Sequence, residues 1–221
     1  MTTLAEIDSQ PASTLVCGHL VCPACAVVDR DWDRMRRGHL CAACGKSSEG
    51  GRLYFPINIH LLVDLMQQAY HSHSPTGPLD GPQGRDVGTV LYFCTLREAL
   101  LNHFLVQMLR AQKVPVALIE RLLDDNRLAS QRFGGLFASV VGQKWDKAVD
   151  QVSRKVATNF SPVSQLMRRA AEIRNSFLHE GSAWAVTREL STECINSASH
   201  MVELFVAFHN EFIHSPLPGN A

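Results

Sequence analysis

Residues 22–44 read CPACAVVDRDWDRMRRGHLCAAC, and this stretch sets the character of the N-terminal part of the chain. It holds two Cys-x-x-Cys pairs, Cys22 with Cys25 and Cys41 with Cys44, with fifteen residues between them. A gap of two residues lets both thiolates of a pair face one ion, and two such pairs complete a tetrahedral shell of four sulfurs. The spacing therefore predicts a Zn²⁺ site. A closed shell leaves no position for water, so we expect the ion to be structural.

Four unrelated thiols are the alternative interpretation of these cysteines. Residues 1–55 are rich in turn-forming residues and lack apolar periodicity, so they cannot bury a core without a metal or cross-links. The chain starts without the basic and apolar regions of a signal peptide, which favours a reducing, cytoplasmic compartment over disulfide formation. Charged or polar residues interrupt every apolar run before it reaches about 18 residues, so we expect a soluble protein with no membrane partner.

Cys17 and His19 precede the first pair and add a second possibility. With the two pairs they resemble the later part of a RING finger, although the leading Cys-x-x-Cys pair of that family is absent. In a RING-like cross-brace they would share an ion with the second pair, which leaves the first pair short of ligands. A single ribbon-like site avoids this deficit, so we favour the two pairs as ligands and treat Cys17 and His19 as accessory. A zinc-finger adaptor with RING-like character stays open as an alternative.

The segment 29–37 between the pairs reads DRDWDRMRR. Its Arg side chains could contact phosphate and Trp32 could stack on a base. The alternative is a solvated loop with Trp32 packed on the zinc knuckle, because three Asp residues dilute the positive charge. Over the whole chain, 21 Lys and Arg balance 21 Asp and Glu, so there is no global basic field and any nucleic-acid contact must be local.

Helical periodicity begins after the Cys-rich part. Asn58 is a plausible N-cap for a helix that ends near Tyr70. Residues 71–88 follow with three Pro and four Gly and no periodicity, which predicts an interdomain linker. The predicted organisation is a zinc-binding module in residues 1–55, a connecting helix and linker in residues 56–88, and a helical bundle in residues 89–215.

The bundle is predicted from apolar stripes at helical spacing. The first stripe consists of Leu96, Leu100, Phe104 and Met108, widened by Leu101, Leu105 and Leu109. Pro115 opens another helix, and Ser161-Pro162 is a start signal for a helix that Gly181 ends. A last helix runs from about Thr187 to Pro216. The predicted fold class is mainly α, with a small ribbon-like zinc finger followed by an up-and-down bundle of four to five helices.

Residues 174–179 read RNSFLH, at the C-terminal end of the helix that Ser161 opens. This segment and the helix order over residues 89–215 resemble the HEPN domain, which is marked by Arg-x4–6-His with a polar residue after the Arg. Asn175 fills that place. Many members of the family are metal-independent endoribonucleases of toxin–antitoxin, abortive-infection and other antiviral systems. Others have lost activity and only bind RNA or nucleotides.

The resemblance implies a catalytic set of Arg174, Asn175 and His179. His179 would move a proton as the RNA 2′-hydroxyl attacks the phosphodiester, and Arg174 would stabilise the charge on the phosphorane. On one helix Arg174 and His179 lie about 140° apart, whereas Asn175 lies about 40° from His179 and can orient it. Two copies of the helix would converge more easily on one phosphate, so we expect a homodimer. RNA and an antitoxin or regulatory protein are the other partners implied.

A purely structural role for the motif is the alternative: Arg174 would pair with Glu172 or Glu180 on the surface, and His179 would cap the helix end. Cys94 and Cys194 lack a nearby Cys-His signature. We expect them to be small buried residues without chemistry.

Overall fold

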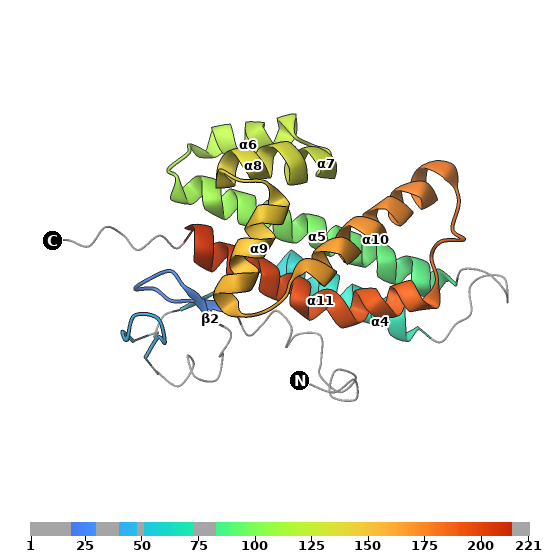
Figure 1. Cartoon of the computed structure of the whole chain (residues 1–221), viewed down its shortest axis with the longest axis horizontal. Helices are drawn as coiled ribbons and strands as arrows, with labels where there is room; N and C mark the ends of the chain where they lie inside the picture. The colour runs from blue at the N-terminus through green and yellow to red at the C-terminus, as the bar shows by residue number, and fades with distance from the viewer. Residues whose placement is uncertain (1–18, 30–39, 48–50, 73–82, 214–221) are drawn as a thin grey trace. The chain divides into compact units, whose positions relative to one another are not determined.

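The computed structural model describes residues 19–29, 40–47, 51–72 and 83–213, and these are mainly helical (Figure 1). A small antiparallel sheet has β1 (Leu20–Val21) between β2 (Val28–Asp29) and β3 (Arg52–Leu53). The helices are α4 (Ile57–His71), α5 (Gly84–Ala111), α6 (Val116–Asp125), α7 (Ala129–Gln131), α8 (Phe137–Val141), α9 (Trp145–Val156), α10 (Ser161–Glu180) and α11 (Arg188–Phe208), with π-helical segments η1 (Arg132–Leu136) and η2 (His209–Ile213). The predicted fold class, a small Cys-rich part followed by helices, is confirmed.

The start of α5 differs from the prediction. The linker was expected to extend to Gly88, but α5 already begins at Gly84. A Cβ atom at Gly88 would lie 3.3 Å from the Cβ of Ala69 in α4, so the glycine permits a close approach of two helices and does not break one. Residues 73–82, the rest of the predicted linker, lie outside the described residues.

The described chain divides into two compact units, and α5 and α11 contribute residues to both. The first unit contains Pro56–Ala99 and Ser161–Val202. Its largest fully buried side chains include Ile59, Met66, Phe93 and Leu96. A buried carboxylate also anchors it: Asp86 accepts a hydrogen bond of 2.6 Å from Ser191 and pairs with Arg188 at 3.1 Å.

The loop between α10 and α11 follows the predicted helix end (Figure 1). Ser161 begins α10, as its Ser-Pro sequence predicts. Gly181 follows the helix with φ +69°, a conformation in which glycine is favoured, and its N–H donates to the carbonyl of Phe177 at 3.2 Å. The helix that carries the Arg-Asn-x-x-x-His motif therefore ends directly after His179 and Glu180.

The second unit contains residues 19–55, Leu100–Phe160 and residues 203–213. Aromatic side chains form much of its core, with ring centroids of neighbouring members 5.0 to 5.9 Å apart. They are Phe104, Phe137, Trp145, Phe205 and Phe208. The Cys-rich residues share this unit with helices, which differs from the separate module that the Pro- and Gly-rich composition of residues 71–88 led us to expect.

Three glycines lie in the described helical part of the second unit, and only Gly142 stands at a helix end. Gly134 and Gly135, which break the sequence pattern, lie within η1, where the turn widens and the chain continues into α8. Gly142 ends α8 with φ +81°. Among the helices that the structure describes, none combines the length and the apolar character needed to cross a membrane.

Candidate metal centre and candidate active site

The four cysteines of the two pairs gather at one point. The Sγ atoms of Cys22, Cys25, Cys41 and Cys44 all lie within 4.8 Å of one another. Cys22 and Cys44 are 3.9 Å apart, and Cys25 and Cys41 are 3.7 Å apart. A tetrahedron with metal–sulfur bonds of about 2.3 Å has sulfur–sulfur edges of about 3.8 Å, whereas a disulfide joins sulfurs at about 2.05 Å. The cluster therefore fits a metal ion and not a disulfide pair.

Both cysteine pairs sit in the same backbone turn. In each, the N–H four residues after the first Cys donates to the carbonyl of that Cys, at 2.9 Å for Cys22 and 2.8 Å for Cys41. The residue at this fourth position has a positive φ, +61° at Ala26 and +67° at Gly45. We call these turns the first knuckle (residues 22–26) and the second knuckle (residues 41–45). Each directs two sulfurs toward a common centre, as the two-residue spacing predicts.

The thiols influence one another's ionisation. Burial raises the pKa of Cys22, but hydrogen bonds from the backbone of Ala24 and Cys25 outweigh it, with a net fall to about 7. Burial is also the largest influence on Cys25, whose pKa is raised to about 12 with the other cluster sulfurs contributing. Four thiolates at this spacing need a cation, because each negative charge opposes the next.

Of the two accessory positions, His19 lies within the described residues and does not join the cluster. His19 is buried, at 2% exposure, with its ring packed edge-on against Phe55 at 5.4 Å. It is not among the residues whose ligand atoms converge in the described part of the chain. Cys17 and the segment 30–39 with Trp32 lie outside the described residues.

The turn that holds Cys22 and Cys25 is attached to η2, which directly follows α11. The side-chain amide of Asn210 accepts a hydrogen bond from the N–H of Val28 and donates one to its carbonyl, each at 2.9 Å. Next to it, Nε2 of His209 lies 3.1 Å from the carbonyl oxygen of Ala26. These contacts explain why the Cys-rich residues belong to a unit with helices. No local sequence pattern predicts the contacts, because their partners are more than 180 positions apart.

Aromatic rings fill the space beside this attachment. The ring of Tyr54 meets His103 at 4.8 Å and His209 at 4.7 Å, both edge-on. Burial lowers the pKa of His103 to about 4, with the charge of His209 as the next contribution. His103 is therefore neutral at neutral pH, and its protonation opposes the folded state.

The predicted catalytic residues lie in α10 but differ in their surroundings. Arg174 is largely buried and forms an ion pair with Glu98 of α5. Asn175 and His179 are exposed. The structural alternative expected an ion pair between Arg174 and Glu172 or Glu180. The ion pair that Arg174 forms is with Glu98, and Glu180 accepts a hydrogen bond from Ser176. The different settings of Arg174 and His179 agree with their angular separation on the helix.

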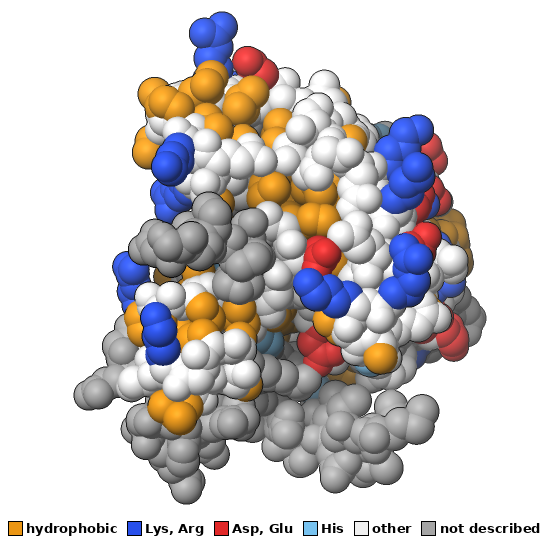
Figure 2. Space-filling view, turned by 60° about the vertical axis from the view of Figure 1, so that its left-hand side comes forward, with side chains coloured by type: hydrophobic (Ala, Val, Ile, Leu, Met, Phe, Trp, Pro, Cys, Tyr) orange, Lys and Arg blue, Asp and Glu red, His pale blue; other side chains and the backbone are white. Residues whose placement is uncertain are grey.

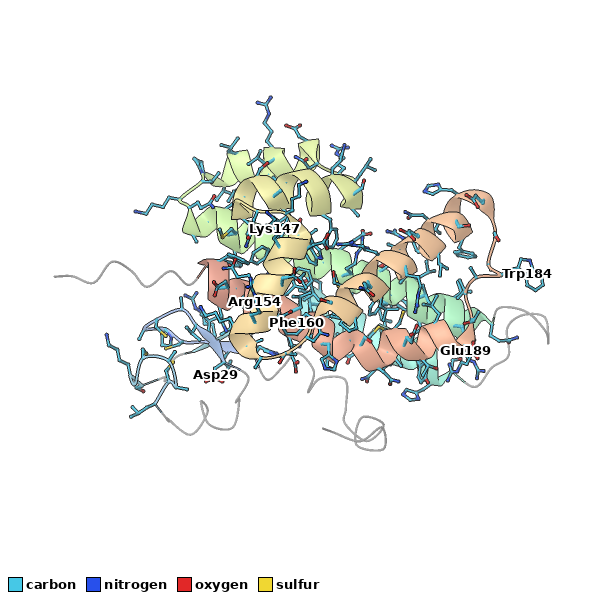
Figure 3. The ribbon with its side chains drawn as sticks, viewed as in Figure 1. Asp29, Lys147, Arg154, Phe160, Trp184 and Glu189 are labelled. Carbon is cyan, nitrogen blue, oxygen red and sulfur yellow. The ribbon has the colours of Figure 1, made fainter. Side chains whose placement is uncertain are left out.

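Two neighbours of the motif have no signal in the sequence. Glu98 precedes Arg174 by 76 positions, and only the packing of α5 against α10 reveals the pair. Trp184 lies in the loop after α10 with 73% of its surface exposed, and its ring points away from the ribbon in Figure 3. An indole so exposed is available to stack on a planar ligand. Cys94 and Cys194 are buried, as expected, at 1% and 0% exposure.

Metal binding is predicted to be stoichiometric and linked to proton release. Because the raised pKa of Cys25 keeps its thiol protonated at neutral pH, binding must displace that proton, and affinity should fall as the pH falls. We expect about one Zn²⁺ per chain by mass spectrometry under native conditions, with protons released in calorimetry in buffers of different ionisation enthalpy. Cys44→Ser should abolish binding and Cys94→Ala should not. Equal stoichiometry in both variants would contradict the assignment.

His103 is predicted to make the protein sensitive to acid. Its folded pKa of about 4 is below the ordinary value of 6.5, so the unfolded chain takes up the proton first as the pH falls. The associated stability is present above pH 6.5 and is lost toward pH 4, by about 3 kcal/mol. Urea unfolding at both pH values should show His103→Phe losing less stability than the parent. The same pH dependence in both proteins would show that another group is responsible.

Comparisons with known proteins give no assignment for the chain. It matches no family model, no curated protein sequence and no solved structure. The metal centre therefore stands on the geometry of its four sulfurs, and the motif in α10 stands on its residue types and their setting.

Proposed function

We propose that this chain is a HEPN-type endoribonuclease that cleaves RNA without a catalytic metal, and that its four-cysteine centre holds a structural Zn²⁺. The observation that carries the proposal is the exposure of Asn175 and His179 at the end of α10, beside an Arg174 that is held in place by Glu98. An imidazole open to solvent is available to a phosphodiester, and the preceding Asn is within reach of it.

The proposed reaction uses the 2′-hydroxyl of the substrate as the nucleophile. His179 takes or returns a proton, a role worth about 10²–10⁴-fold in rate for a positioned acid–base group. Asn175, one turn before His179, orients the imidazole by hydrogen bonding. Arg174 stabilises the negative charge that develops on the phosphorane, and the products carry a 2′,3′-cyclic phosphate and a 5′-hydroxyl.

Binding of RNA in this proposal depends on local contacts. On the face drawn in Figure 2, Lys and Arg side chains are scattered and acidic side chains lie beside several of them. The exposed indole of Trp184, in the loop that follows the motif, supports stacking on an unpaired base. The zinc module adds a surface for RNA or for a protein partner such as an antitoxin. A thiolate-bound metal fits a reducing, cytoplasmic setting, and we propose a role in host defence.

The second candidate is a catalytically silent HEPN scaffold that binds RNA, nucleotide or protein. It is favoured by the ion pair of Arg174 and Glu98, because a guanidinium already bonded to a carboxylate must exchange that anion for a phosphate. The third, a zinc-finger adaptor with RING-like character, requires a second metal ion with ligands beyond the four clustered sulfurs.

Loss of His179 is predicted to abolish RNA cleavage. The purified protein should produce cyclic phosphate and 5′-hydroxyl ends from mixed cellular RNA, mapped by ligation-dependent sequencing. His179→Ala should reduce the rate by about 10²-fold or more, because the proton transfer is lost. His200→Ala is the matched control, since His200 is an exposed histidine on α11 of the same unit.

Undiminished cleavage by His179→Ala would remove this residue from the mechanism. If neither the parent nor the variant cleaves RNA, while both bind it with equal affinity, the silent scaffold is the better description.

A homodimer with composite sites is the expected active form. Arg174 faces α5 while His179 is exposed, so a second copy of α10 is the simplest source of the missing partner around one phosphate. Exposed Leu178, at 54%, supplies apolar surface beside the motif. Sedimentation at micromolar concentration tests the dimer. Mixing Arg174→Gln with His179→Ala should restore partial activity, because one site of the mixed dimer is intact; no recovery from verified heterodimers would exclude shared sites.

A further inference from the structure

The outer edge of the small sheet is closed by a side chain. β2 is an edge strand in the order β2-β1-β3, and Val28, 3% exposed, belongs to it. Edge strands present backbone N–H and C=O groups that need partners when they are buried. Asn210 satisfies both groups of Val28 with one amide, as a residue of a neighbouring strand would. The hydrogen bonding of the sheet therefore ends on η2.

This closure lies close in sequence to two of the metal ligands. Cys22 follows β1 directly, and only Ala26 and Val27 lie between Cys25 and β2, so the turn that holds this pair connects the two strands. The N–H of Cys22 donates to the carbonyl of Val27 at 2.9 Å, which ties the ligand to the residue before Val28. A shift of β2 would therefore move the sulfurs of Cys22 and Cys25 relative to those of the second knuckle.

We propose that Asn210 is a positioning residue of the metal centre, which holds the first knuckle in the geometry that binds the ion. The inference rests on the metal-binding part of the proposed function. His209 supports the same knuckle through its contact with the carbonyl of Ala26. Neither residue touches the ion; they act by fixing the turn that presents two of its four ligands.

Thermodynamic linkage makes the effect reciprocal. If Asn210 raises the affinity for the ion, the ion must strengthen the attachment of η2 to β2 by the same factor. A side chain that merely contributes to stability would weaken the metal-free and the metal-bound protein equally and leave the affinity unchanged. The two roles therefore separate by measurement.

The experiment uses the full chain and Co²⁺ as the probe, because thiolate-bound Co²⁺ gives absorption bands that report ligand number and geometry. Co²⁺ is titrated into metal-free protein and then displaced by Zn²⁺. Asn210→Ala should bind Co²⁺ about 5- to 150-fold more weakly, with the upper value reached if both hydrogen bonds form only in the metal-bound protein. Its spectrum at saturation should equal that of the parent, since the four sulfurs are unchanged. Asn210→Asp should also bind weakly, because its carboxylate faces the carbonyl oxygen of Val28.

Asn102→Ala is the matched control. Asn102 is a partly exposed residue of α5 in the same unit. Its affinity for Co²⁺ should equal that of the parent. If Asn210→Ala does not fold, hydrogen exchange of the parent decides: amides of residues 203–213 should exchange more slowly with Zn²⁺ than without it.

Each outcome has one meaning. Equal affinity of Asn210→Ala and the parent, or no effect of Zn²⁺ on exchange in residues 203–213, overturns the inference while leaving the metal centre intact. A parent that binds neither Co²⁺ nor Zn²⁺ removes the metal centre itself, and with it the premise on which this role of Asn210 rests.

Discussion

Four sulfurs brought within 4.8 Å of one another are the constraint on which the N-terminal part of this chain depends. The strands in the described part of residues 19–55 are only two residues long, and so short a segment gains little from burying surface within itself. A bound cation would offset the repulsion of the thiolates and would supply free energy that such a short segment lacks. The paired turns, the short strands and the ring packing of Tyr54 against Phe55 lie in the same segment as that cluster.

The motif in α10 presents a different balance of forces. Arg174 and Glu98 form an ion pair with side chains 21% and 34% exposed, neither fully solvated nor sealed from water. Such a pair fixes the direction of the guanidinium while leaving part of its surface open to a competing anion. Under the proposed function, whether the site cleaves RNA or only binds it depends on how readily a phosphate shares or replaces the carboxylate. Asn175 and His179, in contrast, are exposed.

Periodic and spaced features of the sequence predicted much of the structure. The Cys-x-x-Cys spacing identified the four clustered cysteines, and the stripe from Leu96 to Met108 marked a buried helix face. Ser161 and Gly181 marked the ends of α10 because capping chemistry is local. The linker boundary was predicted wrongly because Gly88 was interpreted as a helix breaker, whereas it lies inside α5 and permits close contact with Ala69 of α4. Glu98, His103 and Asn210 were out of reach for the same reason: their partners are far away in the sequence.

The attachment of Asn210 to Val28 spans 182 positions of the chain. During synthesis the two Cys pairs therefore leave the ribosome long before the residue that closes their sheet exists. In that interval the cluster can already gather an ion, but the outer edge of β2 has no partner among residues 203–213. Exposed strand edges of this kind invite pairing with other chains. Early occupation of the cluster by metal would keep the turn that holds Cys22 and Cys25 ordered until η2 is synthesised and covers the strand edge.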